Sequence, residues 1–240
     1  MPQLTVLLNP EQRALYLAEL LRLDGLEHIK EDPNAAYAPL SLTSTPEILK
    51  PILKKRQTQL ISVLHDAGIT AYDPSSNTWH FNPDIDRVTT PQVVYAHDTE
   101  KILSSRFFTG HVILPSTGFG NEGEKARLYN RTVVMFVDQH IRVSRMQPYR
   151  AMYLQYDDFG KHAKDFKKIF KLLQEYDPGM GFNGKTPVLL GFHKKTGEVV
   201  DFEELVYTNF PKFQYKYNGD VPILKLRVEH PEVFYEYESK

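Results

Sequence analysis

Cysteine is absent from all 240 residues of the chain. Its absence excludes structural disulfides, thiolate metal sites and a cysteine nucleophile. An excess of charge of one sign is also missing, because 29 Lys and Arg residues stand against 30 Asp and Glu residues. With a net charge of −1, no global field attracts a polyanion. We therefore expect no nucleic-acid polymer among the partners.

Long apolar runs are missing as well. The longest wholly apolar run, Val133 to Val137, is far shorter than the roughly 20 residues that a membrane-spanning helix needs. The stretch Met1 to Asn9 has no basic segment before an apolar one, as a secretory signal would have. We expect a cytoplasmic protein without a membrane partner.

Histidine spacings typical of metal sites do not occur. The nine histidines are scattered singly along the chain, with no HxxxH or HExxH pattern. We therefore expect neither a metal nor a cofactor.

The sequence does contain enough apolar residues for a core, 41% of the chain, in alternating helix and strand patterns. These patterns predict helices over residues 10–23, about 50–67, 98–105 and 160–176, and strands over 35–39, 69–72, 107–114 and 132–137. Asp177-Pro178-Gly179 is expected to stop the last helix. After Pro187 the pattern predicts short strands, over 188–192, 199–202, 213–217, 223–228 and 233–237. The order strand, glycine turn, helix, strand is typical of a parallel α/β sheet.

The most informative segment is the turn Pro115-Ser116-Thr117-Gly118-Phe119-Gly120-Asn121-Glu122-Gly123. It lies where a predicted strand ends and a predicted helix opens at Asn121. Such a junction directs free backbone N–H groups and the positive end of the helix dipole outward. Its glycines let a ligand approach the main chain. We expect an anion or a sugar hydroxyl to bind there.

One interpretation of the turn is a dinucleotide site. Gly118-x-Gly120-x-x-Gly123 matches the dinucleotide fingerprint, and Asp138 ends the next strand where a ribose-binding acid would stand. However, a helix and a strand precede this copy, whereas the fingerprint normally follows the first strand. Glu122 would also repel a pyrophosphate. A dinucleotide-dependent oxidoreductase is therefore the less favoured alternative.

A second interpretation makes Glu122 the working residue. A carboxylate in the first helical turn is stabilised as an anion by the helix dipole, and it would face a ligand held by the glycines. Covalent glycosyl transfer needs such a carboxylate as nucleophile and a second acid for the leaving group, for which Asp98 is the candidate. The structural alternatives are a dipole-complementing Glu122 and an N-capping Asp98.

These motifs resemble a known family. Pro115-Ser116-x-Gly118-x-Gly120-x-Glu122, preceded by an apolar strand and by Asp98, is similar to the nucleoside 2-deoxyribosyltransferase family. Within that family it most resembles the 2'-deoxynucleoside 5'-phosphate N-hydrolases. Upstream, Tyr37-Ala38-Pro39-Leu40 and Tyr72-Asp73-Pro74 are similar to the ends of the family's first two strands. The resemblance spans roughly residues 34–140.

The resemblance implies a role for each matching residue. Glu122 would be the nucleophile and Asp98 would protonate or orient the leaving base. Tyr37 would hydrogen-bond the nucleophile, a place for which Asn9 competes. Ser116 would lie by the 5' end of the sugar, where a neutral donor favours a phosphate. Further substrate contacts would come from Thr117, Gly118, Gly120 and Asn121.

Together these observations predict an α/β fold with a flavodoxin- or Rossmann-like parallel sheet flanked by helices and a β-rich C-terminal extension. We divide the chain into an N-terminal helical extension (1–33), a deoxyribosyltransferase-like core (34–178) and a β-rich appendage (179–240). The expected activity is cleavage or exchange of the N-glycosidic bond of a nucleoside or its 5'-monophosphate, through a sugar bound covalently to Glu122. The resemblance also implies a homo-oligomer. A non-catalytic nucleotide sensor is the alternative from another class.

Overall fold

The main layer of the molecule is a parallel sheet. The computed structural model describes residues 3–40, 45–76, 90–113, 116–141, 150–184 and 186–213. Five strands pair in the order β3-β2-β4-β5-β6, and every neighbouring pair is parallel. They are β2 (Asp32–Tyr37), β3 (Thr70–Tyr72), β4 (Ser105–Val112), β5 (Thr132–Asp138) and β6 (Ala151–Tyr156). Within this sheet the chain follows the doubly wound order of flavodoxin-like folds.

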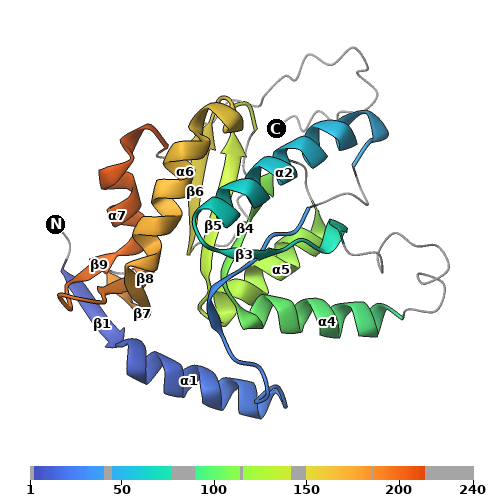
Figure 1. The fold of residues 1–240 in the computed structure, drawn as a ribbon. Coiled ribbons are helices and arrows are strands. Elements are labelled where there is room, and N and C mark those ends of the chain that lie inside the picture. The colour runs from blue at the N-terminus through green and yellow to red at the C-terminus, as the bar shows by residue number, and fades with distance from the viewer. Residues whose placement is uncertain are drawn as a thin grey trace, which may run out of the picture.

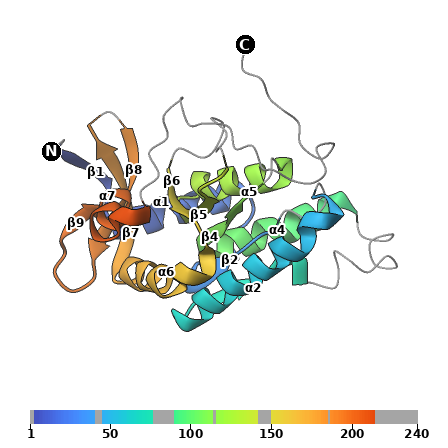
Figure 2. The same ribbon diagram turned by 90° about the horizontal axis from the view of Figure 1, so that it is seen from above.

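Helices cover both faces of this sheet (Figures 1 and 2). On one face α2 (Lys50–Asp66) and α6 (Phe159–Gln174) pack on a core that includes Phe107. On the other face α4 (Pro91–Ser104) and α5 (Thr117–Leu128) pack on a core that includes Phe108. Successive residues of a strand point to opposite faces, so these two phenylalanines enter separate cores. Short 3₁₀ helices span Glu47–Leu49, Pro74–Ser76 and Pro211–Phe213.

A second, antiparallel sheet lies beside the first and joins the two ends of the described chain (Figure 1). Its order is β1-β7-β8-β9. It contains β1 (Leu4–Leu8), β7 (Tyr176–Asn183), β8 (Thr186–His193) and β9 (Val199–Asp201), with the helices α1 (Pro10–Leu23) and α7 (Phe202–Asn209) attached. The predicted fold class is therefore confirmed. The division at residues 33 and 178 stays a prediction, although β1 pairs with β7 across it.

Several elements differ from the sequence prediction. The helix α6 ends at Gln174, before the segment Asp177-Pro178-Gly179 that was expected to stop it, and this segment lies inside β7. A Cβ at Gly179 would lie 2.8 Å from the Leu8 carbonyl oxygen, so the close pairing of β1 and β7 requires glycine there. The pattern missed β6 and also missed α7, whose N-terminus is capped by Asp201. The strands expected over 223–228 and 233–237 lie outside the described residues, as does all of 213–217 except Phe213, which ends a 3₁₀ helix.

The helix boundaries follow local capping. In α1, Pro10 occupies the first turn and the Asn9 side chain accepts a hydrogen bond from the Gln12 N–H at 2.9 Å. In α2, Pro51 lies in the first turn, so the helix starts at Lys50 as expected. No helix among the described residues is both long and apolar enough to cross a membrane.

Candidate active site

The candidate site lies where the strand order of the parallel sheet reverses. β2 is the first strand of this sheet along the chain, and it lies between β3 and β4. In such folds the crevice outside the carboxyl ends of the first and third strands is the usual ligand site. Tyr37 is the last residue of β2, and α5 begins a few residues after β4 ends. The structure therefore brings the predicted Tyr37 and the glycine turn to the same edge of the sheet.

The Ser116 side chain fixes where α5 begins. Its Oγ accepts a hydrogen bond from the Phe119 N–H at 3.3 Å, so Ser116 is the N-cap and the helix starts at Thr117. The predicted start at Asn121 is therefore wrong. Glu122 lies in the second turn, where the dipole effect has largely faded. The expectation that the dipole keeps Glu122 ionised does not hold.

Tyr37 contacts the predicted nucleophile directly. Its side chain is fully buried, and its hydroxyl donates to Glu122 Oε1 at 3.3 Å. The ring stacks against Tyr72 on one neighbouring strand and Phe108 on the other, with centroid distances of 5.7 and 5.8 Å. The rival assignment, Asn9, caps α1 instead and lies after a strand of the other sheet. The structure therefore places Tyr37 as the partner of Glu122.

Asp98 approaches the site from α4. That helix starts at Pro91 with Thr90 as its N-cap, so Asp98 lies in the middle of the helix and does not cap it. Its side chain is only 14% exposed. Asp98 is close enough for its negative charge to raise the pKa of Glu122. The predicted pair of carboxylates is thus brought together from two helices on the same face of the sheet.

The Glu122 carboxyl group has an unusually high proton affinity. Burial is the main cause, and the negative charge of Asp98 adds to it; together they raise the pKa of Glu122 to about 7. The hydrogen bond from Tyr37 and the charge of Lys125 act in the opposite direction. Burial and Glu122 also raise the pKa of Tyr37, which keeps its hydroxyl protonated. A carboxyl group whose pKa is raised in this way is typical of a functional site.

Lys125 is the nearby cation of the site. It follows Glu122 by about one helical turn. Its ammonium group donates to Thr99 Oγ1 and lies 3.6 Å from the centroid of the Tyr95 ring. Both contacts are with α4, so Lys125 links the helix of Glu122 to the helix of Asp98.

The glycines near the site have different roles. A Cβ at Gly110 in β4 would lie 2.7 Å from the Phe119 ring, so that glycine makes room for the first turn of α5. By contrast, no heavy atom of the described chain lies within 4 Å of a Cβ built at Gly120. Internal packing therefore gives no reason for Gly120 to be glycine. Thr117, Gly118 and Asn121 are exposed beside it, and their predicted contacts with substrate stay predictions.

A second polar cluster lies at the same edge of the sheet, toward the α2 face. Arg56 donates to Asp138 Oδ2 at 2.6 Å, and its guanidinium lies over the Tyr156 ring. His111 contacts the Tyr156 hydroxyl at 3.1 Å and the Arg56 carbonyl oxygen at 3.2 Å. Burial lowers the pKa of His111 to about 3, so its ring is neutral. Sequence reasoning missed Arg56, His111 and Tyr156, although polar residues near strand ends were the available signal.

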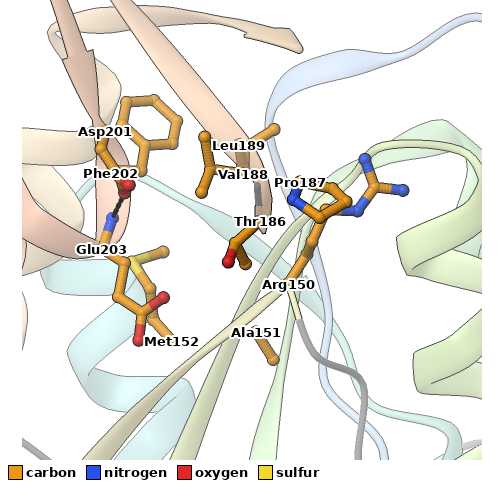
Figure 3. Close-up of a pocket in the computed structure, with 10 residues that line it drawn as sticks. All are labelled: Arg150, Ala151, Met152, Thr186, Pro187, Val188, Leu189, Asp201, Phe202 and Glu203. Atoms are coloured by element: carbon orange, nitrogen blue, oxygen red, sulfur yellow. Dashed lines mark hydrogen bonds between the residues drawn. The ribbon is translucent and has the colours of Figure 1, made fainter. Parts of the chain in front are cut away.

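The structure also contains a small cavity away from these residues (Figure 3). It lies between the two sheets, with β6, β8 and the start of α7 around it. Its volume of about 30 Å³ holds about one water molecule, so it is far too small for a nucleoside. Among the described residues, no three His, Asp or Glu side chains gather as a metal site would require.

Comparison with known proteins shows a structural similarity. No model of a known protein family matches the chain, and no curated protein matches it. One similar solved structure is the CMP N-glycosidase BcmB of Clostridium botulinum, at 15% sequence identity and a TM-score of 0.40. The similarity covers 56% of this chain and 98% of that one. At this TM-score it supports no conclusion about what the present chain binds or does.

Proposed function

We propose that the chain is an enzyme that cleaves or exchanges the N-glycosidic bond of a nucleoside or nucleoside 5'-monophosphate, with Glu122 as the nucleophile. The observation that carries the proposal is the partly buried pair Glu122 and Asp98 beside Tyr37, at the switch point of the sheet. Two neighbouring carboxyl groups can divide the roles of base and acid between them, as glycosyl transfer requires.

The first step forms a glycosyl ester. A carboxylate oxygen of Glu122 attacks C1' of the sugar, and the bond from C1' to the base nitrogen breaks. The electron pair of that bond stays on the base, which takes a proton from the Asp98 carboxyl group. Tyr37 donates to Glu122 Oε1 and so holds the carboxylate in place for the attack. The products are the free base and a sugar bound to Glu122.

The second step releases the sugar. Water attacks C1' and gives its proton to the Asp98 carboxylate, while the bond from C1' to Glu122 breaks. This returns both carboxyl groups to their starting states. A second free base in place of water would make the reaction a transfer. Two inversions at C1' give net retention of configuration.

The pair needs one proton in all. Because burial and the negative charge of Asp98 raise the pKa of Glu122 to about 7, the Glu122 carboxyl group is about half protonated at neutral pH. The reactive form is the one in which that proton lies on Asp98 and Glu122 is ionised. Activity should therefore require Glu122 to lose its proton.

A nucleotide fits this site better than a free nucleoside. Ser116 is a neutral residue at the N-terminus of a twelve-residue helix, where backbone N–H groups favour an anion. A carboxylate in that place would repel a phosphate, whereas a hydroxyl can donate a hydrogen bond to it. The 5'-phosphate would then lie at the turn and C1' beside Glu122.

The test is base release. The purified chain is incubated with deoxy- and ribonucleosides and their monophosphates, with and without a second free base, and the released base is separated by chromatography. We expect release by the wild type and a loss of about a thousandfold or more in Glu122→Gln, since the nucleophile is removed. Glu124→Gln is the matched control, because Glu124 lies on the same helix but pairs with Arg127.

Trapping the intermediate tests the covalent step. A 2'-fluoro nucleotide analogue slows the second step, so intact-protein mass spectrometry should show one added sugar in the wild type and none in Glu122→Gln. Absence of base release from every substrate, with nucleotides still raising the melting temperature, would overturn the enzyme proposal and favour a nucleotide sensor. Because the glycine turn follows the third strand of the sheet and not the first, the structure adds nothing in favour of the dinucleotide alternative.

A further inference from the structure

Two tyrosines at the carboxyl ends of adjacent strands organise the site. Tyr37 and Tyr72 are partners in the parallel register of β2 and β3. Since partners in register lie on the same face, their rings stack with centroids 5.7 Å apart. The hydroxyl of Tyr37 donates to Glu122. The Tyr72 hydroxyl instead meets His97 on α4, with 3.3 Å between its oxygen and His97 Nδ1.

His97 also lies close to the carboxyl group of Asp98. Its Nδ1 atom lies 3.7 Å from Asp98 Oδ1. The His97 ring also lies edge-on to the Tyr72 ring, at a centroid distance of 5.7 Å. The His97 side chain is 27% exposed and that of Asp98 14% exposed, so both are largely enclosed. The His97 Nδ1 atom is therefore close to both the Tyr72 hydroxyl and the Asp98 carboxyl group, which would serve the leaving base.

We propose that His97 is a positioning residue of this site, which acts through Asp98: its Nδ1 atom, which also contacts Tyr72, holds the Asp98 carboxyl group toward the leaving base. The inference rests on the proposed function and deepens it. Glu122 has a hydrogen bond from Tyr37, whereas Asp98 has the neighbouring His97 Nδ1 atom, 3.7 Å from its Oδ1 atom. If the neighbouring His97 ring already restricts the Asp98 side chain, that side chain loses little freedom when substrate binds, which favours a productive orientation.

The chain contains a matched control for this arrangement. His65 and Asp66 form the same His-Asp pair at the end of α2, with 3.9 Å between Nδ1 and Oδ1. Their side chains are 89% and 57% exposed, and they lie outside the candidate site. If adjacency to an aspartate were enough, the two histidines would behave alike. The proposal requires that only His97 affects turnover.

The test is a double-mutant cycle of His97 and Asp98 in the base-release assay. We expect His97→Ala to lower kcat by about 10- to 100-fold with KM changed less than threefold, because orientation and not binding is lost. Tyr72→Phe should give a smaller loss in the same direction. His97→Asn, whose amide can replace Nδ1, should recover part of the loss. His65→Ala should match the wild type.

The double variant separates a role through Asp98 from an independent one. In the Asp98→Asn background, His97→Ala should lower kcat by less than twofold further. If the two losses multiply instead, or if KM carries the whole effect, the inference is wrong. Equal melting temperatures of His97→Asn and the wild type serve as the folding check. A wild type that releases no base from any substrate would overturn the proposed function itself, whereas an active wild type with multiplying losses overturns only the role of His97.

Discussion

The two ends of the parallel sheet hold buried charge in opposite ways. At the amino end, Arg13 from α1 and Arg131 before β5 both donate to Oε2 of Glu31, which precedes β2. At the carboxyl end, Glu122 and Asp98 bring two like charges together. The first group pairs opposite charges across three segments of the chain. The second places the negative charge of Asp98 near Glu122, where it opposes the ionisation of Glu122.

This difference separates a structural cluster from the proposed catalytic one. Burial lowers the pKa of Arg131 to about 9 and that of Arg13 to about 10, yet both stay charged at neutral pH and hold α1 against the sheet. Burial raises the pKa of Glu122 to about 7, so that group gains and loses a proton near neutrality. Desolvation is the main cause in both places. What differs is whether the shifted pKa falls in the range where a reaction can use it.

The largest expected effect is at the amino end. Glu31→Gln leaves Arg13 and Arg131 buried without their shared anion, which should lower the free energy of unfolding by about 3 to 5 kcal/mol. Urea denaturation at pH 7 measures this. Glu19→Gln is the control, because Glu19 and its partner Arg22 are exposed and its loss should leave the curve unchanged. Equal curves for the two variants would show that the amino-end cluster does not stabilise the fold.

The next largest effect is at the carboxyl end, where a substitution should raise the free energy of unfolding instead of lowering it. The pKa of Glu122 in the folded state is raised above its value of about 4.5 in the unfolded state, so the folded protein binds more protons between pH 4.5 and 7. Stability is therefore lost as the pH rises through this range. Glu122→Gln removes the effect, and at pH 8 it should unfold with a free energy about 3 kcal/mol above that of the wild type, but not at pH 4.

Denaturation curves at pH 4 and pH 8 measure this difference. The control is Glu124→Gln. The hydrogen bond from Arg127 lowers the pKa of Glu124, so this variant should be no more stable than the wild type at pH 8. The same stability difference between Glu122→Gln and the wild type at both pH values would contradict the raised pKa.

The smallest expected effect tests how Tyr37 and Asp98 change the pKa of Glu122. The hydrogen bond from Tyr37 lowers the pKa of Glu122, so Tyr37→Phe should raise it. Since the proposed reaction needs ionised Glu122, the acidic limb of kcat/KM should move to higher pH and activity at pH 7 should fall by about tenfold. Asp98→Asn removes repulsion, so the limb that remains should move to lower pH. Profiles of kcat/KM from pH 5 to 9 measure both, and shifts in one common direction would contradict the assigned contacts.

Sequence reasoning predicted most elements whose pattern is local. Leucine spacing with Pro10 in the first turn and Gly25 past the end predicts α1, and the apolar stripe before Gly68 predicts α2. It missed β7, because a strand built on Asp-Pro-Gly has no apolar alternation and depends on its pairing with β1 and β8. The start of α5 was also misplaced, since nothing local shows whether Ser116 caps the helix or lies in the preceding loop. The division into three segments and the assignment of an oligomer stay predictions.

For the candidate site, too, the sequence predicted the local features and the tertiary structure decided the contacts. The residue types and spacing of the 116–122 turn and of Asp98 single out two carboxyl groups and a glycine turn. The sequence alone thus determined that a strand leads into a helix at this turn, because apolar periodicity and turn residues are local features. The reactive role of the two carboxyl groups stays a prediction. Only the tertiary structure decided that Tyr37 and not Asn9 meets Glu122, that His97 lies close to both Tyr72 and Asp98, and that Glu122 titrates near neutrality. Those facts depend on burial and on charges brought from three separate parts of the chain, and desolvation has no signature in a linear sequence.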